Sequence, residues 1–346
     1  MRVFWDPVQA RHAPRFFLQR GQVRHNYEIP ARAGALLAGC RALGLDPELP
    51  PPAPRGTLEA VHTPDYLDFL RDAPAAWSRL PGAASEMVPN IHPSPEMIAN
   101  GASLEQAGAG SLIARLGWYT ADLSCPIAVD TWPAAAAAAA CAIAAADEAG
   151  GGRSAYALSR PPGHHAYPAR AGGHCYLNNA ALAAERLREN GAARVAILDL
   201  DSHHGNGTQG IFWNRGDVLF VSLHGDPAGY YPWYTGFVGE RGAGPGEGYT
   251  LNLPLAEGTG NAGWLDALDS GLAAIRAFHP DAVVVSLGFD ASESEPLGFL
   301  RVSSEGYARA GEQVAALKLP IAVIQEGGYN VDTLAGLLAR FLGALL

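Results

Sequence analysis

The sequence predicts an α/β fold in which a central parallel sheet is flanked by helices. Short apolar runs alternate with helical stretches through the middle and end of the 346-residue chain, which is typical of βα units. The run Ala282–Leu287 has no polar face before Ser286, as expected for a strand buried within a parallel sheet. Histidines and acidic residues follow directly after several of these runs, and open α/β sheets bind their ligands at that end of the strands.

The elements are predicted in chain order. Pro133 suits the first turn of a helix that Ala134–Ala140 extend, because proline is tolerated there and alanine has the highest helix propensity. Further helices are expected at Ala180–Arg188 and Asp266–Phe278. The strand candidates are Ala155–Leu158, Val195–Asp199, Val218–Leu223, Ala282–Leu287 and Ile321–Gln325.

The segment from about Pro74 to Thr131 differs from the rest, being rich in Gly, Pro, Ser and Asn and weak in periodicity. Long loops are often functional, so we interpret it as loops over the mouth of a site that also offer an interface. The alternative is a surface excursion without a role.

Composition favours a single catalytic domain over residues 1–346. Hydrophobic residues make up 48% of the chain, and no linker or charge run divides it. The formal charge of −10 is spread without a basic patch, so nucleic-acid binding is not expected. The run Ala134–Ala140 is too short to span a bilayer and Met1–Asp6 do not resemble a secretory signal, so no membrane association is expected. Four cysteines without Cys-x-x-Cys spacing favour a reducing, cytoplasmic location.

Two clusters of histidine and aspartate predict a hydrolytic metal site. The first is the pair His164 and His165, which follows a strand candidate and a Pro-Pro-Gly turn. The second is Asp-Leu-Asp-Ser-His-His-Gly, from Asp199 to Gly205, at the end of the next strand. A catalytic zinc takes imidazole and carboxylate ligands of this kind and leaves one position open for water or substrate.

Three of these residues are predicted to hold the ion. Asp201 and His203 are two positions apart on an extended segment, so their side chains point the same way. Asp290 is the best candidate for the third ligand, because it follows the buried strand candidate Ala282–Leu287. A zinc ion there would polarise an amide carbonyl and lower the pKa of a bound water, and an imidazole would serve as base and acid.

The order and spacing of several segments closely resemble the zinc-dependent histone deacetylase superfamily, and within it the acetylpolyamine amidohydrolase-like bacterial branch. The resemblance covers roughly residues 1–340 and implies a single-domain arginase/deacetylase-like fold with the active site at the C-terminal ends of the strands. It implies a small-molecule N-acyl amine substrate and one zinc ion. The matching segments are RPPGHHAYPARAGGHCYLNNAA from Arg160, VAILDLDSHHGNGTQGIF from Val195, VSLHGDP from Val221, VVSLGFDASESEPLGF from Val284, EGGYN from Glu326 and, more weakly, VHTPDYLDFL from Val61.

The resemblance also assigns catalytic roles. It implies that His165 is the general base and acid and His164 an electrostatic helper, with Asp199 as the partner of His164 and Asn206 as the partner of His165. An amide oxygen orients an imidazole without stabilising its cation, so we expect His165 to remain neutral readily, which suits a base. Tyr329 matches the tyrosine that donates a hydrogen bond to the oxyanion of the tetrahedral intermediate.

Substrate contacts are less closely defined by the resemblance. Tyr231 matches one wall of the family's narrow aromatic slot, and Gly173 precedes the other wall. That wall is His174 here, where the family usually has Phe or Tyr, so the slot is expected to be more polar. His174 either contacts substrate or only fills space. Acidic residues that would meet a distant ammonium group are not evident, although Glu293 and Glu295 are candidates.

Further implications concern ions and assembly. The resemblance implies structural potassium sites and a homodimer formed through the long loop at about residues 74–120. The remaining histidines His62, His92, His204 and His279 are expected to pack without binding metal, while His224 stays ambiguous. The potassium sites correspond to Asp199, Asp201, His203, Ser222 and Leu223 for one, and to Phe212, Arg215, Val218 and Tyr249 for the other.

Three functions compete at this point. The first is a zinc amidohydrolase for acetylated small amines, acyl-lysine or a xenobiotic amide. The second is a two-manganese ureohydrolase, which needs an Asp-x-His-x-Asp run, whereas the fifth position here is Gly205. The third is a ligand sensor that has lost turnover, although no expected catalytic residue is missing.

Overall fold

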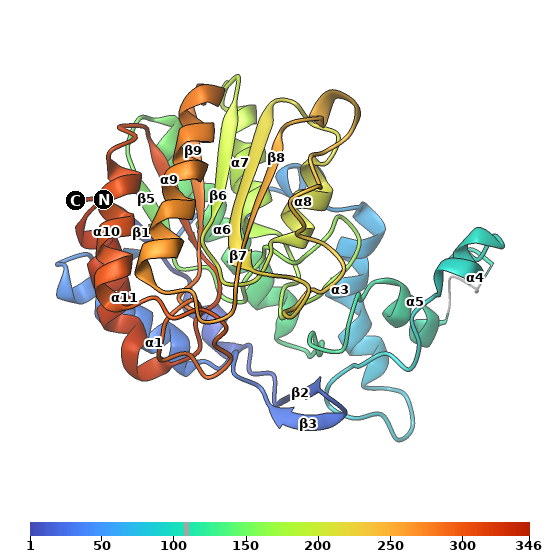
Figure 1. Ribbon diagram of the computed structural model, residues 1–346. Coiled ribbons are helices and arrows are strands. Elements are labelled where there is room, and N and C mark those ends of the chain that lie inside the picture. Colours follow the sequence, from blue (N-terminus) through green and yellow to red (C-terminus); the bar gives the residue numbers. More distant parts are fainter. Residues whose placement is uncertain (107–110) are drawn as a thin grey trace.

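The centre of the protein is a parallel eight-stranded sheet in the order β4-β1-β5-β10-β9-β6-β7-β8 (Figure 1). The computed structural model describes residues 1–106 and 111–346. An antiparallel pair, β2 (Phe16–Gln19) and β3 (Gln22–His25), projects from the body of the molecule. The strands of the large sheet are β1 (Arg2–Phe4), β4 (Pro47–Glu48), β5 (Ala155–Ala157), β6 (Val195–Asp199), β7 (Val218–Gly225), β8 (Thr250–Leu255), β9 (Ala282–Leu287) and β10 (Ile321–Gln325).

Helices cover both faces of the sheet. One face packs against α3 (Pro64–Trp77), α6 (Thr131–Gly150) and α7 (Asn179–Glu189), and the other against α1 (Ala31–Ala42), α9 (Asn261–Phe278), α10 (Ser304–Ala315) and α11 (Val331–Gly343). Residues of β6 alternate between these two layers, since Val195 and Ile197 contact the first and Ala196 and Leu198 the second. The shorter helices are α2 (Arg55–Glu59), α4 (Pro95–Ala99), α5 (Leu112–Trp118) and α8 (Asn206–Phe212).

The main helices follow from their sequences. The alanines of α6 are nearly all buried, and their small side chains allow close packing against the sheet and against α7. Ser303 begins α10 and Asn330 begins α11, each with a side-chain oxygen accepting a backbone N–H of the first turn.

The strands predicted from apolar runs agree well with the structure. The bounds of β6, β9 and β10 are as predicted, β5 ends one residue earlier, and β7 continues to Gly225. Helix α7 extends one residue beyond the prediction at each end, and α9 begins at Asn261 rather than Asp266, because its first turn lacks apolar periodicity. Helix α6 begins at Thr131, two residues before Pro133.

The loop-rich segment 74–131 contains α4, α5 and the end of α3, joined by irregular backbone. Its residues 107–110 lie outside the described part of the chain. Helices α4 and α5 extend away from the sheet in Figure 1. Large apolar side chains on this excursion are exposed, namely Leu80, Ile91, Met97, Ile98 and Val129.

The polar residues of interest follow the C-terminal ends of neighbouring strands. His164 and His165 follow β5, Tyr329 follows β10, Asp290 follows β9, and Asp201 and His203 follow β6. Because β5, β10, β9 and β6 are consecutive in a parallel sheet, these side chains meet at one edge of it. Within the described residues, no helix combines the length and hydropathy that crossing a bilayer would require.

Candidate active site

Two buried carboxylates and a partly buried imidazole converge beyond β6 and β9. The imidazole Nδ1 of His203 lies 2.9 Å from Asp290 Oδ2 and 3.1 Å from Asp201 Oδ1, and ligand atoms of all three residues lie within 4.8 Å of one another. Burial and the neighbouring carboxylate of Asp201 raise the pKa of Asp290. Two carboxylates held this close in the interior call for a cation between them, so the donor set suits a divalent metal such as zinc.

Backbone groups fix both carboxylates. The amide of Ser202 donates to Asp290 Oδ1 at 2.8 Å, and the amide of Gly327 donates to Asp201 Oδ2 at 2.9 Å. A Cβ atom at Gly327 would overlap both aspartate side chains, and one at Gly288 would overlap Asp201. These two glycines therefore leave the space that the acidic cluster occupies.

The two adjacent histidines each have a separate partner. His164 Nδ1 lies 3.0 Å from Asp199 Oδ2, and His165 Nδ1 lies 2.6 Å from Asn206 Oδ1. These are the partners that the resemblance implies, and the two rings lie 4.0 Å apart between centroids. The catalytic roles of the four residues remain predictions.

The pKa values of the two imidazoles are shifted in opposite directions. Burial favours the neutral form of His164, but the carboxylates of Asp201 and Asp199 outweigh it and raise the His164 pKa well above its ordinary value. Burial, together with the neighbouring imidazoles of His164 and His203, holds the pKa of His165 well below its ordinary value. A neutral His165 can accept a proton.

Tyr329 lies on the loop after β10, beside His174, with the two ring centroids 5.9 Å apart. Its side chain is 9% exposed. The guanidinium of the fully buried Arg32 lies 4.8 Å from the centre of the Tyr329 ring. Arg32 also donates to the carbonyl oxygens of Glu326 and Gly328, each at 2.6 Å, so it fixes the loop that carries the tyrosine.

The proposed slot has a polar link between its walls. Tyr231 packs edge-on against His165, with ring centroids 5.0 Å apart, and its hydroxyl donates to Asp122 Oδ2 at 2.6 Å. The same carboxylate oxygen accepts the amide of Gly173 at 3.0 Å. A Cβ at Gly173 would overlap the His165 ring, so only glycine allows this approach.

His174 occupies the other wall in a left-handed backbone conformation with φ of 68°, which is uncommon for a residue with a side chain. Its ring packs against Phe17 at 5.6 Å, and its buried Nε2 has no hydrogen-bond partner among the described residues. Burial, with smaller contributions from nearby charged groups, lowers the His174 pKa to about 4, so the ring is neutral near pH 7.

Replacing His174 with phenylalanine is expected to change the order of preferred substrates. The substitution removes a buried nitrogen without a partner and makes the wall apolar, so amides with plain alkyl chains should gain relative to polar ones, by a fewfold. Relative kcat/KM values over a panel of N-acyl amines measure this. If the order stays the same, the His174 ring only fills space.

Sequence reasoning missed Asp122, Arg32 and Glu326. Glu326 is fully buried, accepts the amides of Gly163 and His164, and burial raises its pKa to about 7. It belongs to a second group of possible metal donors with His164 and Cys175. Glu326 begins the EGGYN segment, but nothing in the sequence shows that its side chain supports His164. Arg32 lies near the recognised motifs only in the folded chain, and Asp122 lies in the loop-rich segment, where the sequence offers no pattern.

The other singled-out residues lie away from the three-residue cluster. His204 and His224 pack together with ring centroids 4.7 Å apart, and their nearest polar partners are Gln209 and Ser222. Glu295 accepts the backbone amide of Tyr329 at 3.0 Å, and burial raises its pKa to about 7. The Nδ1 atoms of His62 and His92 hydrogen-bond to backbone carbonyl oxygens, and His62 Nε2 accepts the backbone amide of Asn178.

The positions assigned to potassium lie at the ends of β6 and β7 and around α8. Asp199 and Ser222 are register partners on the two strands, and Leu223 follows Ser222. Phe212 ends α8, and the amide of Arg215 donates to its carbonyl oxygen at 2.9 Å. Tyr249 precedes β8, and its carbonyl oxygen accepts the amide of Phe220. Potassium binding at either place stays a prediction.

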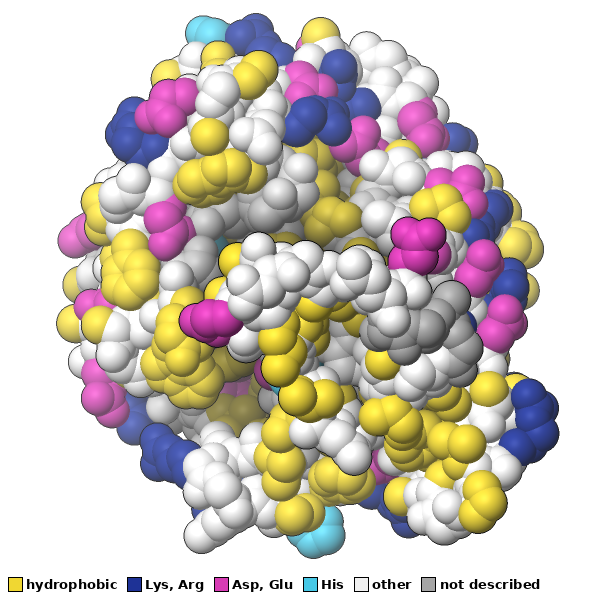
Figure 2. All heavy atoms as spheres, turned by 90° about the vertical axis from the view of Figure 1, so that its right-hand side faces the viewer, with side chains coloured by type: hydrophobic (Ala, Val, Ile, Leu, Met, Phe, Trp, Pro, Cys, Tyr) yellow, Lys and Arg dark blue, Asp and Glu magenta, His cyan; other side chains and the backbone are white. Residues whose placement is uncertain are grey.

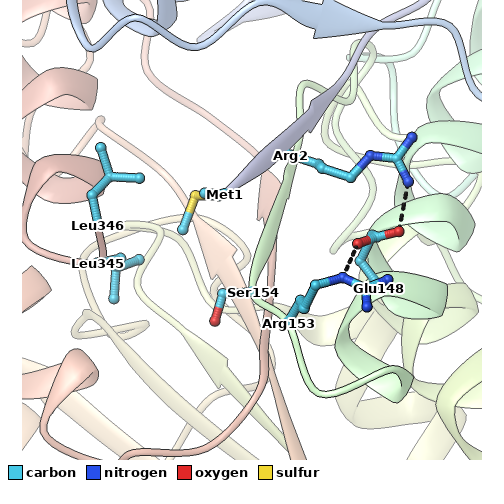
Figure 3. Close-up of a pocket in the computed structure, with 7 residues that line it drawn as sticks. All are labelled: Met1, Arg2, Glu148, Arg153, Ser154, Leu345 and Leu346. Atoms are coloured by element: carbon cyan, nitrogen blue, oxygen red, sulfur yellow. Dashed lines mark hydrogen bonds and ion pairs between the residues drawn. The ribbon is translucent and has the colours of Figure 1, made fainter.

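A surface cavity of about 420 Å³ lies at the other end of the sheet and is no part of this site. It is bordered by both chain ends, with Met1 on one side and Leu345 and Leu346 on the other (Figure 3). Arg2 and Arg153 both point toward Glu148 and pair with it, and Arg2 also pairs with Glu48.

The chain is a hydrolase that acts on amide bonds, as the following comparisons show. The histone deacetylase domain family matches residues 26–345, and the chain belongs to this family, in its acetylpolyamine amidohydrolase branch. The sheet and its flanking helices accordingly have the arginase/deacetylase-like architecture that the sequence predicts.

Several known proteins are similar over nearly the whole chain. An acetylpolyamine amidohydrolase of Burkholderia pseudomallei (strain 1710b) is 41% identical over 99% of this chain and 98% of its own length. Acetylpolyamine amidohydrolase 1 of Pseudomonas aeruginosa is 42% identical, over 91% and 90%. A crystal structure of the acetylpolyamine aminohydrolase from Burkholderia pseudomallei superimposes with a TM-score of 0.93, covering 100% of this chain and 98% of that one, at 41% identity.

Proposed function

We propose that the chain is a zinc-dependent amidohydrolase that removes the acyl group from N-acyl amines of the acetylpolyamine type. The observation that carries the proposal is the cluster of Asp201, His203 and Asp290, which lies beside the neutral His165. The names of the similar proteins support acetylpolyamines as the substrate class. The carboxylate of Asp122, at the slot wall, adds negative charge where a cationic amine would pass.

The residues present suit zinc and fit a single ion. Asp201, His203 and Asp290 would hold it, and when bound it would polarise the amide carbonyl and lower the pKa of a water. A second ion of the ureohydrolase kind would need an acidic residue in place of Gly205. A Cβ atom there would overlap the carboxylate of Asp199, so the position has no room for one. Structural potassium is proposed at the positions named above.

The protein's own residues would then act in sequence. His165, neutral and held by Asn206, would take the proton of the attacking water and later give it to the leaving amine. His164, paired with Asp199, would contribute positive charge beside the reacting centre. The hydroxyl of Tyr329 would donate to the oxyanion, while Tyr231 and His174 would hold the alkyl chain.

Replacing Asn206 with aspartate is expected to shift the pH dependence of hydrolysis. The pKa of His165 lies below its ordinary value, so the imidazole stays neutral to lower pH. The decline of kcat/KM on the acid side should therefore occur at a pH below about 6.5. A carboxylate beside Nδ1 would stabilise the imidazolium, raise the pKa, and move the limb upward by roughly one pH unit. A pH profile of kcat/KM measures the shift. An unmoved limb would mean that His165 is not the titrating base.

Amine release from a substrate panel tests the proposed function. The zinc-loaded protein is given acetylputrescine, acetylspermidine, an acetyl-lysine peptide and a small aryl acetamide, with His165→Ala as the blank. We expect hydrolysis of the acetylated polyamines that is lost in the blank. If the protein prefers the acetyl-lysine peptide or the aryl acetamide, that compound class replaces acetylpolyamines as the assigned substrate. If it hydrolyses none of the four compounds, the proposal is rejected.

We also propose that the protein is a cytoplasmic homodimer. The exposed Ile91, Met97 and Ile98 of the loop-rich excursion provide an apolar surface for a second copy. Figure 2 shows the side of the molecule that carries this excursion, where hydrophobic side chains gather around hollows. The four cysteines are all buried and unpaired, which suits a reducing compartment. Sedimentation equilibrium tests the dimer, and a mass of one 36.2 kDa chain would contradict it.

A further inference from the structure

The loop after β7 exposes several large aromatic and apolar side chains beside the slot. Between Tyr230 and Glu240 the exposed fractions are 53% for Trp233, 93% for Tyr234, 41% for Phe237 and 68% for Val238. Exposing an indole ring to water costs free energy, so its placement next to an active site calls for a role. None of these four side chains belongs to the catalytic machinery described above.

Trp233 differs from the others because its ring continues the slot wall outward. Ring centroids step 5.0 Å from His165 to Tyr231 and 5.4 Å from Tyr231 to Trp233, and both contacts are edge-to-face. The Trp233 ring therefore lies within about 10 Å of the proposed proton-transfer histidine. Along this path exposure rises from the buried His165 through the half-buried Tyr231 to the exposed Trp233.

The backbone of the loop maintains this arrangement. Trp233 has a left-handed φ of 60°, and its amide donates to the carbonyl of Tyr230 at 3.0 Å. The carboxylate of Glu240 accepts the Gly236 amide at 2.9 Å and the Thr235 hydroxyl at 2.8 Å within the loop. It also accepts the side-chain amide of Gln209 on α8 at 2.6 Å, which ties the far side of the loop to the body of the protein. These hydrogen bonds hold the loop that carries the Trp233 indole in place.

The length of a small diamine matches this path. In acetylputrescine five single bonds separate the amide nitrogen from the ammonium nitrogen, which is roughly 6 Å when extended. With the amide beside His165, the ammonium would reach the outer end of the Tyr231 wall, within the range of about 6 Å over which an aromatic face attracts a cation. Asp122, bonded to the Tyr231 hydroxyl, makes the same region negative.

We propose that Trp233 is a specificity-determining residue that receives the distal ammonium group of the substrate on its indole face. This inference rests on the proposed function, because it presumes a cationic N-acyl amine in the slot. Trp233 discriminates by charge, so it favours amides that carry a cation about five bonds from the scissile nitrogen over neutral chains of equal length. A docking face for another protein is the competing explanation for the exposed indole.

Two amides that differ only in charge test the proposal. Acetylputrescine carries the ammonium, and N-pentylacetamide has a methyl group in its place. The ratio of their kcat/KM values is measured for the unchanged protein and for Trp233→Leu, Trp233→Phe and the matched control Tyr234→Leu. We expect Trp233→Leu to lower the ratio about two- to fivefold, Trp233→Phe to lower it less, and Tyr234→Leu to leave it unchanged.

A binding measurement separates this proposal from the proposed function. Calorimetry on the zinc-loaded His165→Ala protein, with and without Trp233→Leu, gives the ratio of affinities without turnover. If the ratio of affinities depends on Trp233 but the unchanged protein hydrolyses neither amide, the proposed function is rejected and the cation site is retained. A ratio that Trp233→Leu leaves unchanged, or that Tyr234→Leu lowers equally, overturns the cation site. If Trp233→Leu leaves the ratio of affinities unchanged but lowers the mass measured by sedimentation, Trp233 belongs to a protein interface.

Discussion

The protein with Asp290 replaced by alanine is expected to lose bound zinc and amide hydrolysis together. Asp290 is one of the three proposed ligands, and its Oδ2 atom lies 2.9 Å from Nδ1 of His203. With two ligands left the ion would not be retained, and its loss would remove several kcal/mol of transition-state stabilisation, or about 10³-fold or more in kcat/KM. Zinc content by atomic emission and hydrolysis of acetylputrescine measure the two effects on one sample.

Asp281 provides the matched control, because it precedes β9 while Asp290 follows it. Its exposed carboxylate accepts the backbone amide of Arg194 at 2.9 Å, far from the cluster along the same strand. Asp281→Ala should therefore keep one zinc ion per chain and full activity. Stoichiometric zinc in Asp290→Ala would contradict the ligand assignment. A thermal melt of each variant distinguishes loss of the ion from loss of the fold.

The central strands could be predicted because burial on both faces leaves a local signature. In β9 and β6 nearly every residue is apolar, and the polar residues come where each strand ends. The edge strand β4 and its neighbour β1 are only two and three residues long, and the other edge strand, β8, is interrupted by Asn252 and Pro254. Their pairing depends on neighbours that are distant in sequence, so local periodicity does not reveal them.

Within the site, too, some residues could be predicted from a local sequence pattern, and others depend on contacts with residues distant in sequence. The ligand and histidine candidates lie in short recognisable runs, and parallel topology brings the ends of those runs together. Arg32 bonds to the carbonyl of Gly328 across 296 positions, and Tyr231 reaches Asp122 across 109. Such supporting contacts have no spacing rule, because an isolated buried arginine or a loop aspartate resembles many others in one sequence. Only the folded chain identifies them.

Replacing Tyr329 with phenylalanine is expected to lower kcat by about 10²- to 10³-fold while zinc stays bound, since one donor to an oxyanion typically contributes about 3 to 4 kcal/mol. KM should change little, because the hydroxyl acts mainly in the transition state. Phenylalanine retains the ring that packs on Arg32 and His174, and the loop is held through the backbone carbonyls of Glu326 and Gly328. The variant therefore removes the donor without moving its support.

Tyr307→Phe is the control for this substitution. Tyr307 is fully buried against Trp264 and Phe289, and its hydroxyl has no hydrogen-bond partner among the residues that the structure describes. Removing that hydroxyl should leave kcat unchanged, so a loss seen only with Tyr329→Phe reports on the reacting carbonyl. If Tyr329→Phe turned over at the normal rate, the oxyanion would have to be stabilised by the metal site and His164 without it.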